Sequence, residues 1–305
     1  MGARPERSAT LQPTDAYAEL AFAALAHLPV RPSRSGGAGA AASAAAASIT
    51  DARWLAWAAE AVPAAVREPL ARDADAVSAS LAAAGAAAVM ALHALPALHR
   101  DLGQFEATSR MELGTLNAAR VADGKVLHVL RAVPAMPLEL LRCGMLLAAP
   151  GWRRAWPEVQ RELELARAAC EPSFVSARLL SPRLAAQPVE LSHALGAHGR
   201  AIGGRVWVGA PLAWNDHGPD DAALWALHEV AVTAAAEVRA AGASAEDAAA
   251  RWRGEEAVAI RSVTALVAGT RLATAHARWL ARLSLGALPE PSTAEVAATL
   301  AALRA

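Results

Sequence analysis

Lysine, phenylalanine and tyrosine are nearly absent from this chain of 305 residues. It holds one lysine, Lys125, three phenylalanines and one tyrosine. With so little lysine, we expect neither a phosphate-binding G-x-x-x-x-G-K-[ST] loop nor an enzyme that forms a Schiff base on lysine. The 29 basic and 29 acidic residues cancel, and no basic run occurs. We therefore expect neither nucleic acid nor an anionic membrane surface as a partner.

Cysteine is also scarce, and targeting segments are not evident. Cys143 and Cys170 are too few for a disulfide framework, so two free buried thiols are favoured, although a single bond between them stays open. The N-terminus has no apolar core flanked by positive charge, which a signal peptide requires. Residues 76–98 carry no formal charge, but alanine dominates them, so they predict a helix packed inside the protein rather than a membrane span. These features lead us to expect a cytoplasmic protein.

Alanine is what the chain has in abundance, at more than a quarter of all residues. Arginine supplies every basic residue except Lys125, and this combination is typical of a bacterial genome rich in G and C. Hydrophobic residues make up 55% and charged residues 19%, which is a globular composition. Because alanine fills little space, the nine tryptophans are expected to anchor the core.

Four regions follow from the pattern of proline, glycine and apolar residues. We predict an N-terminal helical segment at 1–30, a Gly/Ala/Ser-rich linker at 31–49, a helical region at 50–150 and a C-terminal helical region at 151–305. Asp123-Gly124 predicts a β-hairpin near 117–130.

Within the C-terminal region, short strands are expected near 189–191 and 205–208, separated by a glycine-rich loop. Helices are expected at 222–241 and 244–268, and a helix break at Pro150-Gly151. The predicted fold class is mainly α with a small antiparallel β component (α+β).

Histidines and carboxylates gather between residues 193 and 229. The sharpest pattern is Leu224–Val232, an apolar helical frame around His228-Glu229 that follows the predicted strand and a loop. This strand–loop–helix unit in the C-terminal half resembles the active-site unit of zincin metallopeptidases over about residues 205–260. In that family H-E-x-x-H places two zinc-binding imidazoles one helical turn apart, and the glutamate polarises the attacking water.

The resemblance implies Glu229 as the catalytic residue and His228 as a zinc ligand. Val232 occupies the position of the second histidine. A replacement ligand would then come from His217, His193 or His198, of which His217 directly precedes the helix. As in gluzincins, a following helix would supply a carboxylate, Glu255 or Glu256. The implied ligand set is His228, His217 and Glu256, and the implied cofactor is zinc.

Structural roles remain open for the same residues. His228 fits a core histidine equally well, and Glu229 either faces solvent or is buried with Arg205, Arg251 or Arg261 as its partner. Two classes of function are therefore consistent with the sequence. One is a zincin-like protein, an atypical or inactive metal-dependent hydrolase. The other is a non-catalytic helical protein that binds a peptide or protein partner, such as the accessory subunit of a peptide-modifying or assembly enzyme.

Overall fold

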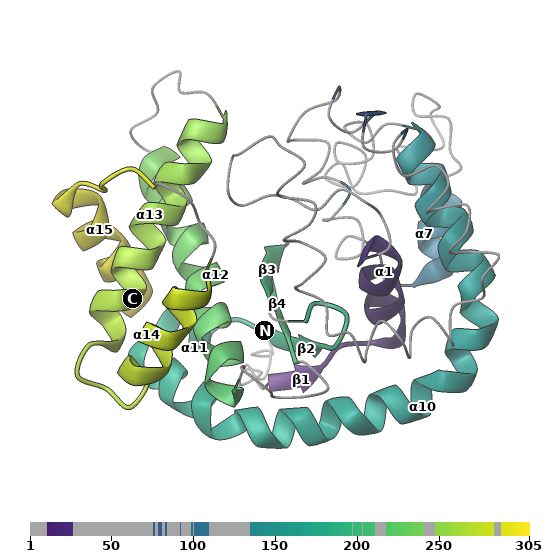
Figure 1. Cartoon of the computed structure of the whole chain (residues 1–305), viewed down its shortest axis with the longest axis horizontal. Helices are drawn as coiled ribbons and strands as arrows, with labels where there is room; N and C mark the ends of the chain where they lie inside the picture. The colour runs from purple at the N-terminus through teal and green to yellow at the C-terminus, as the bar shows by residue number, and fades with distance from the viewer. Residues whose placement is uncertain are drawn as a thin grey trace, which may run out of the picture. The chain divides into compact units, whose positions relative to one another are not determined.

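The computed structural model describes residues 11–26, 76, 79–80, 83, 92, 99, 101–109, 135–196, 198–202, 204–210, 218–240, 248–283 and 288–305. These residues are mostly helical and include one small four-stranded sheet (Figure 1). The prediction of a mainly α fold with a small β component is confirmed at this level. The predicted linker at 31–49 and the hairpin near 117–130 lie outside the described residues.

The chain divides into two compact units. The first comprises residues 1–13, 34–37 and 162–305, and the second comprises 14–33 and 38–161. The sheet and the helices that surround the predicted site all belong to the first unit. That unit therefore positions the functional candidates.

The sheet has the strand order β1-β2-β4-β3, with β1 at Leu11–Pro13, β2 at Val189–Ser192, β4 at Arg205–Gly209 and β3 at Gly199–Ile202. The two predicted strands, β2 and β4, are confirmed. The antiparallel expectation is wrong for most of the sheet, because β1 pairs with β2 and β2 with β4 in parallel. Only β3 and β4 are antiparallel, and β3 forms within the glycine-rich segment where a loop was expected.

Helix α12, Pro219–Ala240, is the central helix of the first unit. It packs against β3 and β4 and also against α13 (Ala248–Val267), α14 (Ala273–Arg282) and α15 (Thr293–Arg304), while the short α11 (Pro182–Ala185) packs on α12 and α15. Neighbours on several sides explain why every residue from Asp221 to Ala231 is buried. A helix that is apolar around its whole circumference is stable only in such a position.

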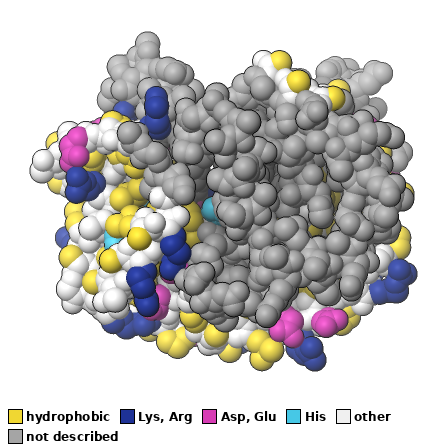
Figure 2. All heavy atoms as spheres, in the orientation of Figure 1, with side chains coloured by type: hydrophobic (Ala, Val, Ile, Leu, Met, Phe, Trp, Pro, Cys, Tyr) yellow, Lys and Arg dark blue, Asp and Glu magenta, His cyan; other side chains and the backbone are white. Residues whose placement is uncertain are grey.

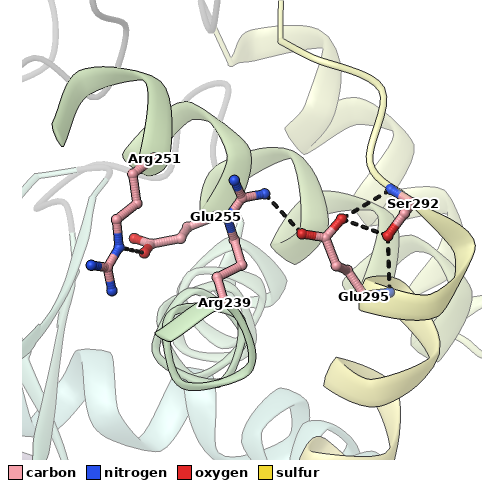
Figure 3. A network of polar contacts seen from close by, with 5 residues as sticks. All are labelled: Arg239, Arg251, Glu255, Ser292 and Glu295. Carbon is pink, nitrogen blue, oxygen red and sulfur yellow. Dashed lines mark hydrogen bonds and ion pairs between the residues drawn. The ribbon is translucent and has the colours of Figure 1, made fainter. Parts of the chain in front are cut away.

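Polar contacts tie the far ends of these helices together (Figure 3). Ser292 caps α15 by accepting from the Glu295 backbone N–H at 3.2 Å, and the Glu295 carboxylate accepts from the Ser292 N–H in return. Arg239 of α12 reaches the same carboxylate at 2.9 Å. Its guanidinium lies directly over Gly254 of α13, where a Cβ atom would come within 2.5 Å of Nη1. The absence of a side chain at Gly254 thus lets the arginine cross α13.

Helix α10, Ala135–Leu180, is continuous, so the helix break predicted at Pro150-Gly151 is wrong. A proline removes one backbone hydrogen bond, and here packing on both sides of it offsets that loss. Met145 and Trp152 flank Pro150 and are almost fully buried. In the second unit, which also holds α1 (Ala16–Ala26) and α7 (Leu102–Ser109), the Trp152 indole N–H donates to the Ala16 carbonyl at 2.8 Å.

Both cysteines are free, as the sequence favoured. Cys170 is buried in α10, and burial raises the pKa of its thiol to about 12. Within the described part of the chain, no helix combines the length and the apolar character needed to cross a bilayer.

Candidate functional site

The structure brings two of the implied zinc ligands together. His228 of α12 and Glu256 of α13 meet where these helices pack, with 2.9 Å between His228 Nε2 and Glu256 Oε1. Their side chains are 0% and 1% exposed, so water has no access to either group. Helix α12 begins with Pro219 and carries acidic residues in its first turn, as a helix N-terminus favours. Glu256, the carboxylate that the resemblance implies as a zinc ligand from the following helix, thus lies in contact with His228, while its role as a ligand stays a prediction.

The contact between these two groups is close but poorly directed for a hydrogen bond. Among the described residues, neither ring nitrogen of His228 has a hydrogen-bond partner of acceptable geometry, although Nε2 lies within ion-pair distance of the Glu256 carboxylate. A buried pair of this kind costs desolvation energy that only good geometry or a further group recovers.

Two aromatic rings pack against His228. The ring centroids of Trp225 and Trp279 lie 5.6 Å and 5.4 Å from that of the histidine, and the two indoles meet edge to face at 5.1 Å. His276 of α14 stacks on Trp279 at 5.6 Å. The pKa of His276 is lowered to about 4, first by its burial and then by the nearby His228. His276 is therefore uncharged at neutral pH, and the cluster has the character of a packed core.

Glu229, the residue implied as catalytic, has a different partner from any expected. It is 3% exposed, and its Oε2 accepts a hydrogen bond from the Ala201 backbone N–H of β3 at 3.0 Å. The three expected arginine partners were wrong. Arg205, Arg251 and Arg261 instead pair with Glu190, Glu255 and Glu290.

The hydrogen bond from Ala201 occupies the outer edge of the sheet. Gly209 N donates to the His198 carbonyl, and the register then places Arg200 opposite Trp207. Bonded and non-bonded pairs alternate in an antiparallel ladder, so the polar backbone groups of Gly199 and Ala201 point away from β4. Glu229 accepts from Ala201, and the Arg200 side chain donates to the Gly199 carbonyl at 2.8 Å. Two of the four outward-facing groups, the Ala201 N–H and the Gly199 carbonyl, are therefore satisfied by side chains of this protein.

Gly199 permits this arrangement by letting α12 approach β3 closely. A Cβ atom at this position would lie 2.8 Å from Glu229 Cγ and 3.3 Å from both the Cβ and the carbonyl oxygen of Trp225. Any side chain here would push the strand away from the helix and lengthen the Glu229–Ala201 contact.

The other predicted candidates are not gathered around His228. Glu255 turns to Arg251 on its own helix, with 3.0 Å between Oε1 and Nε (Figure 3). His193 is buried beside the sheet, where its Nδ1 donates to the Ala210 carbonyl. His198 packs its ring on Trp225, with centroids 5.3 Å apart. His217 lies outside the described residues.

These positions bear directly on zinc binding. Across the described ranges, no group of three histidine, cysteine or acidic residues stands ready to hold a metal ion. A catalytic zinc needs three protein ligands and an open position for water. His228 and Glu256 supply two ligand atoms in a space closed to solvent, so the described residues alone do not fit a catalytic zinc ion.

Sequence reasoning missed His276 and the part that Trp279 plays beside it. The two residues are spaced i, i+3 on α14 and so share one helix face, which predicts only that both are buried together. Nothing in the spacing connects α14 with α12, because that contact depends on the tertiary packing.

Comparison with protein-family models, with curated proteins and with solved structures found no match to this chain.

Proposed function

We propose that this chain is a zincin-like protein that has lost hydrolytic chemistry and acts by binding rather than by cleavage. The observation that carries the proposal is the position of Glu229. A general base must face the water that it activates, whereas this carboxylate is buried and accepts a hydrogen bond from Ala201 N–H of the edge strand. Its role in the fold is to hold α12 against β3.

The closed pair of His228 and Glu256 supports the same conclusion. With exposed fractions of 0% and 1%, the two side chains leave no room for a bound water or a substrate carbonyl. Trp225 and Trp279 complete the enclosure of the imidazole. The likeness to a zincin is thus one of arrangement, in which an antiparallel strand, a His-Glu helix and a second helix with a glutamate adjoin one another, while the chemistry is absent.

One observation favours a second candidate, an atypical metal-dependent hydrolase. Two side chains that bind one zinc ion lie close together, but their donor atoms are directed at the metal and not at each other. The 2.9 Å contact between His228 Nε2 and Glu256 Oε1 likewise lacks hydrogen-bond geometry. A third ligand would then have to come from His217, and the ion would act as the Lewis acid for hydrolysis.

Metal content and stability together separate the two candidates. The untagged full-length protein is purified from zinc-supplemented medium, its zinc is measured by mass spectrometry, and thermal unfolding is followed with and without EDTA. The binding protein should contain less than about 0.1 zinc ion per chain and unfold at the same temperature with the chelator. In the metal-free protein, Glu256→Gln removes a buried partner and should cost about 1–3 kcal/mol in free energy of unfolding.

Glu255→Gln is the matched control, since it lies next to Glu256 and loses only a partly exposed ion pair, worth at most about 1 kcal/mol. The proposal would be wrong if the protein carried stoichiometric zinc that His228→Gln and Glu256→Gln both abolish and Glu255→Gln retains. That result would show a metal site at this pair and favour the metal-dependent candidate instead.

A further inference from the structure

The C-terminal part of α10 exposes large apolar side chains to solvent. Leu165, Val175 and Leu179 are 60%, 49% and 81% exposed. Figure 2 shows hydrophobic side chains interspersed with charged ones along the lower rim of the molecule, where α10 runs in Figure 1. Single exposed leucines are ordinary on a protein surface, whereas a connected row marks a contact surface.

The exposed residues form such a row. Leu165, Ala168, Pro172, Val175 and Leu179 are all exposed and are spaced by three and four residues in turn, the a/d spacing of a coiled-coil helix. We call this row the α10 stripe. It extends over about 21 Å at about 1.5 Å per residue.

The buried side of α10 is distinct from this stripe. Leu163, Cys170, Phe174 and Ala177 are completely buried, and Ala166 nearly so. The helix therefore has two apolar faces, one of which packs within the chain while the other meets solvent. The buried side contacts α12, as where the Ser173 hydroxyl donates to Asp220, whereas burial within the described part of the chain assigns the α10 stripe no role.

Charged residues of both signs border one flank of the stripe. Glu164, Glu171 and Arg178 recur there at seven-residue intervals, so they share one side of the helix. Glu164 contacts Arg167 at 2.8 Å, and Arg178 reaches Glu171 only at 3.9 Å. The opposite flank carries Ala169 and Ser176, which have no charge.

We propose that the α10 stripe is a self-association surface that binds a second copy of this chain, with the two helices antiparallel about a two-fold axis near Pro172. In this arrangement Leu165 of each copy packs on Leu179 of the other, and the smaller Ala168 and Pro172 let the helices approach at the centre. A two-fold axis brings the same patch of both copies together, so the stripe must complement itself, as it does.

The charges select the antiparallel direction. The two-fold axis puts the charged flanks of both copies side by side. Glu164 of each copy then lies near Arg178 of the other, which forms two opposite-charge pairs, while the two Glu171 side chains meet near the axis as one like-charge pair, so attraction outnumbers repulsion. A parallel pair would set each charged flank against the uncharged flank with Ala169 and Ser176, which offers these groups no partner. Charge complementarity at the edges of an apolar seam commonly sets helix orientation in this way.

Sedimentation velocity of the full-length protein over a range of concentrations tests the proposal. We expect a concentration-dependent dimer, and Leu179→Gln should weaken it at least about a hundredfold, because the change removes one buried leucine from each copy. Leu147→Gln is the matched control. Leu147 is 56% exposed on the same helix, but it would face no residue of the second α10, which ends at Leu180.

Charge reversal tests the direction of the pair. Glu164→Arg and Arg178→Glu should each weaken the homodimer about tenfold, since each places like charges opposite one another, and an equal mixture of the two variants should restore dimerisation. A protein that stays monomeric at all concentrations would overturn the proposal. A dimer that Leu179→Gln does not weaken, or a mixture that fails to restore association, would also overturn it. The same holds if Leu179→Gln only lowers the melting temperature, because the stripe would then be covered within its own chain.

Discussion

Replacing Gly199 with alanine should destabilise the first unit by about 1–2 kcal/mol. The added Cβ atom would lie 2.8 Å from Glu229 Cγ and 3.3 Å from the Trp225 carbonyl oxygen. Carbon atoms in contact prefer about 3.5–4.0 Å, so roughly 1 Å must be relieved by moving β3 or α12. Overpacking of this kind costs about 1–3 kcal/mol, and the reduced freedom of the unfolded chain offsets about 0.4–1 kcal/mol of that cost.

Urea unfolding followed by far-ultraviolet circular dichroism measures this change as a shift of the transition midpoint at constant slope. Gly218→Ala is the control in the same unit, since a Cβ atom there meets nothing within 4 Å. We expect the control to change the free energy of unfolding by no more than about 0.5 kcal/mol, because the loss of a favourable helix-capping residue and the stiffer unfolded chain nearly cancel. An unchanged midpoint for Gly199→Ala would show that α12 does not rest on β3 as closely as described, and the structural role given to Glu229 would fail with it.

Two further predictions concern pH and helix capping. The pKa of His276 is about 4 in the folded protein against about 6.5 in the unfolded chain, so the unfolded chain binds a proton first as the pH falls. The free energy of unfolding should therefore decrease by about 2.5 kcal/mol between pH 6.5 and pH 4. His276→Gln should flatten this part of the pH profile, and an equally steep profile in the variant would assign it to another group. Ser292→Ala should lower the free energy of unfolding by about 1 kcal/mol and raise the pKa of Glu295, which the hydrogen bond from the Ser292 side chain lowers. Ser292→Thr should preserve both the stability and the pKa, as measured by unfolding and by NMR titration of the carboxylate.

Local patterns in the sequence predicted the elements of the site better than their contacts. The apolar frame around His228 and the acidic first turn predicted α12. The resemblance to gluzincins implied Glu255 or Glu256 as a ligand from the following helix, and Glu256 lies beside His228. The prediction of α12 depends on helix geometry, which repeats along the chain. The partner of Glu229 could not be predicted, because a backbone N–H of Ala201 has no signature in the side-chain sequence.

Long-range pairing limited the prediction of the sheet in the same way. β1 has three residues and no alternating pattern, so its parallel contact with β2 depends on which segments the fold brings together. Residue propensities alone predict a loop for the glycine-rich segment that forms β3. Helix α12 stabilises this segment as a strand by packing on Gly199. The helix break predicted at Pro150 was wrong for a related reason. A proline ends an isolated helix, but it is tolerated where α10 is packed on either side of it.

The parallel pairing of β1 with β2 has a consequence for how the protein is made. Leu11–Pro13 leave the ribosome before any residue of the second unit, yet their partner strand follows that unit in the chain. Domains usually fold in the order of their synthesis, whereas this first strand must wait unpaired until β2 emerges, and closing so long a loop is slow. The unit that holds His228 therefore forms late, and nascent chains stalled before residue 189 should lack it although they already contain its first strand.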